Sequence, residues 1–76
     1  MITVKLYGLL RLDSGIKERQ LEASTVLQVL EHLQDQGIPR KNLSGAVILV
    51  NGETANKRKK LNDGDVVQLL SPVAGG

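Results

Sequence analysis

The 76-residue chain carries ten basic and eight acidic side chains, a net charge of +2, and no cysteine. Without cysteine it can form no disulfide, no thiolate metal site and no cysteine nucleophile. Its length predicts one domain near the lower limit for folding without such cross-links, with an aliphatic core because Tyr7 is the only aromatic residue. So small a core leaves little room for a pocket that would enclose a drug-sized ligand.

The chain has no sequence signal for a membrane or for secretion. No apolar run approaches the roughly 20 residues that a membrane-spanning helix needs. From Ile2 the chain alternates apolar and polar residues instead of showing the basic and apolar regions of a signal peptide. We therefore expect a soluble, cytoplasmic protein that does not bind a membrane.

The first two predicted elements are strands. Ile2, Val4 and Leu6 alternate with the side chains between them, which is typical of a strand with one buried face. Asp13-Ser14-Gly15 has the composition of a turn, and residues 16–22 predict a second, more exposed strand. The two strands should form a hairpin whose loop is longer than a tight turn.

A helix over residues 26–36 is the next predicted element. Thr25 has the chemistry of an N-cap, and Gln28, three residues later, completes a capping box. Gly37 suits the left-handed position that follows a helix, and Pro39 prevents continuation. Four apolar residues at helical spacing form one face of this helix: Val26, Val29, Leu30 and Leu33.

Two further strands complete the predicted elements. Residues 46–50 are an apolar run closed by the turn signal Asn51-Gly52. Residues 53–60 are polar and predict a connection with little buried surface. Asp63-Gly64 is a second turn, and residues 66–70 predict the last strand.

This order of elements predicts an α+β fold. One helix can cover only one face of a sheet of about four main strands, which matches a ubiquitin-like β-grasp arrangement. Pro72 cannot donate to a sheet ladder, so it should end the last strand. We therefore expect one domain over residues 1–71, followed by a flexible tail over residues 72–76, while the order of the strands stays open.

The tail has a composition suited to chemistry at its end. Gly75 and Gly76 lack a Cβ, so they could let a terminal carboxylate pass through a narrow channel. Four residues from Val73 to Gly76 would reach at most about 13–14 Å. Two neighbouring glycines also arise by chance, and an ordinary frayed terminus is the alternative interpretation.

Several segments resemble the MoaD/ThiS family of ubiquitin-like sulfur carriers, and the small subunit of molybdopterin synthase in particular. Ser71 is a departure, because the family often shows two prolines at positions 71 and 72. The segments that carry the resemblance are Met1-Ile2-Thr3-Val4-Lys5-Leu6-Tyr7, Leu10-Arg11-Leu12, Gly15, Val50-Asn51-Gly52, Leu61-Asn62-Asp63-Gly64-Asp65-Val66-Val67 and Pro72-Val73-Ala74-Gly75-Gly76.

The resemblance implies a carrier protein that is not itself an enzyme and binds no cofactor. An E1-like adenylyltransferase would use ATP to form an acyl-adenylate at Gly76, and a persulfide donor would then leave a thiocarboxylate. The larger catalytic subunit of molybdopterin synthase would receive the sulfur, with Pro72, Val73, Ala74 and Gly75 giving the tail access to its active site. Delivery to thiamine, cysteine or tRNA, conjugation to other proteins, and a non-covalent adaptor stay open.

A docking surface is expected on the sheet face opposite the helix. Val67 and Leu69 should face the helix with Leu6 pointing inward, so their strand neighbours project from the opposite face. These neighbours would form an apolar patch beside the tail, to which the resemblance adds a basic residue. Ordinary exposure at a sheet edge is the alternative. The expected partner-binding residues are Tyr7, Arg11, Val66 and Leu70.

Other polar residues predict no catalytic or metal site. The basic run over residues 57–60 lacks the interleaved aromatic residues of single-stranded nucleic-acid readers, so a solvated loop is favoured over an acidic partner, and no nucleic acid is expected. His32 lacks companion ligands for zinc, and Ser44 and Ser71 have no histidine base beside them. Asp63 and Asp65 flank a glycine and should stabilise a turn.

Overall fold

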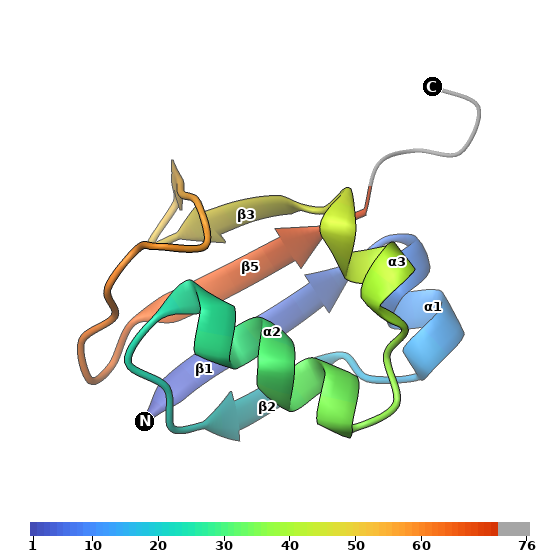
Figure 1. Cartoon of the computed structure of the whole chain (residues 1–76), viewed down its shortest axis with the longest axis horizontal. Helices are drawn as coiled ribbons and strands as arrows, with labels where there is room; N and C mark the ends of the chain where they lie inside the picture. Colours follow the sequence, from blue (N-terminus) through green and yellow to red (C-terminus); the bar gives the residue numbers. More distant parts are fainter. Residues whose placement is uncertain (72–76) are drawn as a thin grey trace.

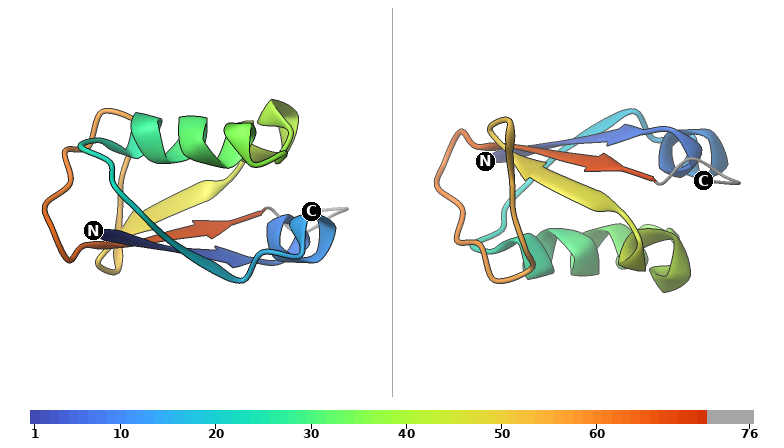
Figure 2. Two further views of the ribbon diagram at one scale, coloured as in Figure 1. Left: turned by 90° about the horizontal axis from the view of Figure 1, so that it is seen from below. Right: turned by 90° about the horizontal axis from the view of Figure 1, so that it is seen from above.

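The computed structural model describes residues 1–71. Within them, five strands form one mixed sheet in the order β2-β1-β5-β3-β4, and α2 packs across one of its faces (Figures 1 and 2). The α+β class and the β-grasp arrangement predicted from the sequence are confirmed. The elements are β1 (Ile2–Tyr7), α1 (Leu9–Ser14), β2 (Glu18–Leu21), α2 (Val26–Asp35), α3 (Arg40–Ser44), β3 (Val47–Val50), β4 (Glu53–Thr54) and β5 (Val66–Leu70).

The strands β1 and β5 form a parallel pair at the centre of the sheet. Their register runs from Thr3 opposite Val66 to Tyr7 opposite Leu70. β2 pairs antiparallel with β1, and β3 pairs antiparallel with β5. The ends of β1 and β5 therefore meet at one end of the sheet, which is also where α1 lies (Figure 1).

The core lies between α2 and the sheet and is aliphatic. Val67 and Leu69 of β5 are fully buried, while the residues that alternate with them are partly exposed. This confirms the predicted inward face of β5. All four residues of the predicted helix face are also buried: Val26, Val29, Leu30 and Leu33.

Helix α2 begins and ends almost as predicted. The Thr25 hydroxyl accepts a hydrogen bond from the backbone N–H of Gln28 at 3.3 Å. The Gln28 side chain accepts one from the backbone of Ser24 rather than from Thr25, at 2.6 Å. After the helix, Gly37 has φ of 101° and Ile38 donates to the Leu33 carbonyl at 3.1 Å, as in a Schellman motif.

Two short helices, α1 and α3, lie in segments for which the sequence predicted no helix. β1 and β2 form the predicted hairpin, and its long connection contains α1 between Gly8 and Gly15. Both glycines have positive φ, 64° and 73°. The second helix, α3, follows Pro39. Each helix buries one leucine, too few for a helical pattern to be visible in the sequence.

The remaining differences concern the edge strands. The strand predicted over residues 16–22 is shorter, and residues 53–60, predicted as a connection, contain the two-residue strand β4. Within the described part of the chain, no helix has both the length and the apolar character needed to cross a membrane.

Candidate functional site

The sheet face opposite α2 is the candidate site. Figure 2 shows α2 and α3 on one side of the sheet, whereas no helix drawn from residues 1–71 covers the opposite side. The side chains on this open face come from β1, β5 and β3, and at one edge from Glu18 and Gln20 of β2. They are ordered in rows across the strands, because parallel and antiparallel neighbours align side by side.

One of these rows is apolar and lies at the end of the sheet where β5 ends. Leu70 is the partner of Tyr7 on one side and of Val47 on the other. Tyr7 and Leu70 are half-buried, and 48% of Val47 is exposed. We call Tyr7, Leu70 and Val47 the apolar row.

The next row is mixed in character and supports the first. Gln68 lies between Lys5 and Leu49. Its side-chain amide donates a hydrogen bond to the Tyr7 hydroxyl at 3.1 Å. This bond links Tyr7 to the neighbouring row and limits the orientations that its ring can take.

The structure places the predicted partner-binding residues unequally. Tyr7 and Leu70 are neighbours, and Arg11 is exposed on α1 at the same end of the molecule. Val66 shares the open face, but it lies four positions before Leu70, or about 13 Å along the strand. Their role in binding a partner stays a prediction.

Sequence reasoning missed the contribution of β3 to this face. Val47 and Leu49 project from the open face, while Val50 is buried. Residues 46–50 are apolar throughout, so period-two alternation could not assign a face. Only the register with β5 shows that Val47 extends the apolar row.

The chain leaves the sheet next to the apolar row, at Ser71. The Ser71 hydroxyl accepts a hydrogen bond from the backbone N–H of Leu9 at 2.7 Å. The predictions that concern the tail fall on Pro72, Val73, Ala74, Gly75 and Gly76, which lie outside the described residues.

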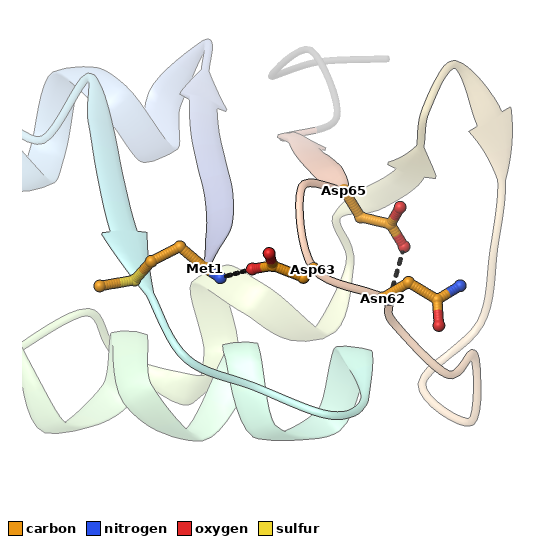
Figure 3. A network of polar contacts seen from close by, with 4 residues as sticks. All are labelled: Met1, Asn62, Asp63 and Asp65. Carbon is orange, nitrogen blue, oxygen red and sulfur yellow. Dashed lines mark hydrogen bonds and ion pairs between the residues drawn. The ribbon is translucent and has the colours of Figure 1, made fainter.

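The other end of β5 is a turn held by polar contacts (Figure 3). The Asp65 carboxylate accepts hydrogen bonds from the backbone of Asn62 at 2.9 Å and from the side-chain amide of Asn51 at 3.0 Å. These bonds, the first above all, hold the pKa of Asp65 below its ordinary value. Asp63 pairs with the ammonium group of Met1. The predicted turn-stabilising role of Asp65 is confirmed.

The basic run lies near this turn, away from the apolar row. Arg58, Lys59 and Lys60 line a hollow of about 500 Å³, together with the carboxylates of Glu53 and Asp65. The acidic side chains offset part of the positive charge. His32 is exposed, and residues 1–71 contain no group of three potential metal ligands.

These features define a ubiquitin-like β-grasp protein with an open sheet face. The profile of the ThiS family matches residues 4–76. The chain belongs to the ThiS family, a group of ubiquitin-like sulfur carriers and modifiers. No curated protein sequence matches the chain closely enough to count as a relative.

Solved structures agree with this assignment. A chain in the complex of subunits 1 and 2 of molybdopterin-converting factor from Helicobacter pylori is 26% identical, with a TM-score of 0.75 over 99% of this chain and 97% of that one. In the BexX/CysO complex of Amycolatopsis orientalis, the matching chain is 26% identical, with a TM-score of 0.77 and full coverage of both chains. Small archaeal modifier protein 1 from Methanosarcina acetivorans is 28% identical, with a TM-score of 0.80 over 99% of this chain and 95% of that one.

Proposed function

We propose that this chain is the sulfur carrier of molybdopterin synthesis and acts through the carboxylate of Gly76. An E1-like adenylyltransferase in the cytoplasm uses ATP to convert this carboxylate into an acyl-adenylate. The sulfur of a persulfide donor then attacks the acyl carbon and AMP leaves. Reductive cleavage of the resulting acyl disulfide by a thiol leaves a thiocarboxylate on the carrier.

The carrier is the smaller, non-catalytic subunit in this scheme. It binds no cofactor, and ATP is consumed by the activating enzyme. The larger molybdopterin synthase subunit supplies the site where the thiocarboxylate sulfur attacks a pterin precursor. Pro72, Val73, Ala74 and Gly75 serve as the narrow connection between the folded domain and that site.

The apolar row is the single observation that carries this proposal. Partly exposed apolar side chains gathered on one face are the kind of surface that a protein partner covers. Ser71 follows Leu70 directly, so a partner that covers the row also meets the start of the tail. Docking and delivery of the carboxylate are thereby coupled at one end of the sheet.

The solved relatives support partner binding of this kind. The Helicobacter pylori structure is a complex between the two subunits of molybdopterin-converting factor, and the Amycolatopsis orientalis structure is also a protein complex. Both matching chains align with nearly the whole of this one. A domain of this size and fold can therefore act as the small member of a two-protein assembly.

Conjugation to other proteins is the second candidate function. The similarity to small archaeal modifier protein 1 from Methanosarcina acetivorans favours it, because that relative is named as a modifier. Both functions begin with activation of the same carboxylate. They differ in the acceptor, which is a small molecule held by a partner in one case and a lysine of another protein in the other.

Mass spectrometry after incubation with an E1-like enzyme, ATP and a persulfide donor tests the proposal. The intact chain should gain the mass of one oxygen-to-sulfur exchange, localised to Gly76. Deletion of Gly76 should abolish the gain and leave the denaturation midpoint unchanged, because the tail follows the last strand. Sulfur loading of the Gly76-deleted chain would contradict the carrier function, and isopeptide adducts without a thiocarboxylate would favour the modifier.

A further inference from the structure

We propose that Ser71 and Gly8 form a latch that positions the start of the tail for the activating enzyme. This inference rests on the proposed function and assigns a positioning role to two residues outside the tail. The latch consists of the Ser71 hydroxyl, the backbone of residues 7–9 and the space left by the missing side chain of Gly8.

The hydroxyl of Ser71 links the end of β5 to the segment that follows β1. It accepts a hydrogen bond from the Leu9 backbone N–H at 2.7 Å, across 62 positions in sequence. It also donates to the Tyr7 carbonyl oxygen at 3.5 Å, a longer and weaker contact. The Leu9 N–H lies at the start of α1, where no acceptor is available within the helix, and Gly8 has no side chain to supply one.

The residue at position 8 must be small for this contact to exist. Gly8 has φ of 64°, in the region that side chains rarely adopt. A Cβ at this position would lie 2.6 Å from the Ser71 hydroxyl oxygen, closer than real Cβ contacts, but 3.9 Å from the Ser71 Cβ. The steric demand on position 8 therefore comes chiefly from the hydroxyl.

The latch holds the first residue after β5 in place. Leu70 is held by ladder pairing with β1 and β3, and Ser71 is held through its side chain instead. The bond thereby fixes where residues 72–76 begin, relative to the apolar row. Fixing this starting point in the free carrier removes part of the conformational entropy that binding in a channel would otherwise cost.

This role predicts an effect on binding and not on chemistry. Once the tail lies in the enzyme, the contacts of the enzyme hold the carboxylate, so the rate of the bound complex does not depend on the latch. Ser71→Ala should raise the KM for sulfur loading by about twofold to tenfold, because the loss of one protein hydrogen bond changes an equilibrium constant by about that factor. The kcat should stay unchanged, and Ser71→Thr, which keeps the hydroxyl, should restore the KM.

The decisive test combines Ser71→Ala with Gly8→Ala. Gly8→Ala alone should raise the KM, because the new methyl group displaces the hydroxyl. In the Ser71→Ala background it should add little to the KM, because the close contact has gone, although its backbone strain still lowers stability in both backgrounds.

Ser24→Ala is the matched control, since it makes the same change at the start of α2 and should leave the KM unchanged. Equal KM values for Ser71→Ala and the unmodified chain, or additive KM effects of the two substitutions, would overturn the latch.

A second measurement separates failure of the latch from failure of the proposed function. Hydrogen exchange of the Leu9 amide, followed by NMR in the free protein, needs no partner. Exchange should accelerate about twofold to tenfold in Ser71→Ala and stay unchanged in Ser24→Ala. If the unmodified chain is never loaded with sulfur, the carrier function fails, and unchanged Leu9 exchange in Ser71→Ala overturns the latch independently.

Discussion

The two ends of the five-residue strand β5 differ in the contacts that surround them. At its beginning, the side chains of Asn51 and Asp65 hydrogen-bond to each other and to the backbone N–H groups of Val66 and Asn62. This end is therefore held by contacts within the domain. At its end, Leu70 lies in a row of partly exposed apolar side chains that nothing within residues 1–71 fully covers. The comparison shows that polar contacts hold both ends of β5 in place, whereas the exposed apolar row lies only at the tail end.

The largest change in stability should come from the core that both ends share. Leu30 is 3% exposed on the inner face of α2, and Leu30→Ala should lower the free energy of unfolding by about 2–5 kcal/mol. Leu27→Ala on the same helix is the control, because Leu27 is 48% exposed, and it should cost far less. Chemical denaturation measures both, and equal midpoints would contradict the assigned inner face.

The next effect should distinguish the two ends of the open face. Leu70→Glu places a charge in the apolar row, which a partner must desolvate, and should weaken binding to the larger subunit by about 2 kcal/mol. Val66→Glu makes the same kind of change on the same strand and face, but at the turn end, and should weaken binding less. Calorimetric titration compares the two variants. A larger loss for Val66→Glu would move the interface toward the turn.

The smallest effect should be a pH dependence that belongs to the turn end. The pKa of Asp65 is lowered below its ordinary value of 3.8, so its ionised form stabilises the folded state. This contribution is present above the ordinary pKa and is lost as the pH falls through the lowered one. Asp65→Asn should therefore have a lower free energy of unfolding than the unmodified chain at neutral pH. On acidification its free energy of unfolding should fall by less than that of the unmodified chain. Denaturation midpoints that fall equally for both proteins between about pH 5 and pH 2 would exclude this contribution.

The sequence predicted the elements whose pattern is long and regular. Helix α2 was predicted because four apolar residues, a capping threonine and Gly37 agree over three turns. The strands β1 and β5 were predicted because they alternate. Helices α1 and α3 were missed because each buries one leucine, and a single buried residue shows no period.

The candidate site was predictable only in part, since its assembly depends on long-range pairing. Leu70 and Tyr7 could be assigned to the open face from alternation alone. The contribution of Val47 needed the register between β3 and β5. The contact between Ser71 and Leu9 joins residues 62 positions apart, and no local pattern indicates such a bond.

The central place of β5 also has a consequence for the order in which the protein can fold. β5 is the shared neighbour of β1 and β3, so neither of these strands can complete its pairing until β5 has been synthesised. Pairing of such distant segments is slow compared with helix formation, because a long loop must close first. A chain that stops short of residue 70 on the ribosome therefore lacks both a finished sheet and a tail. The strand that completes the sheet also leads directly into Ser71, so under the proposed function the domain is folded before its terminal carboxylate is loaded with sulfur.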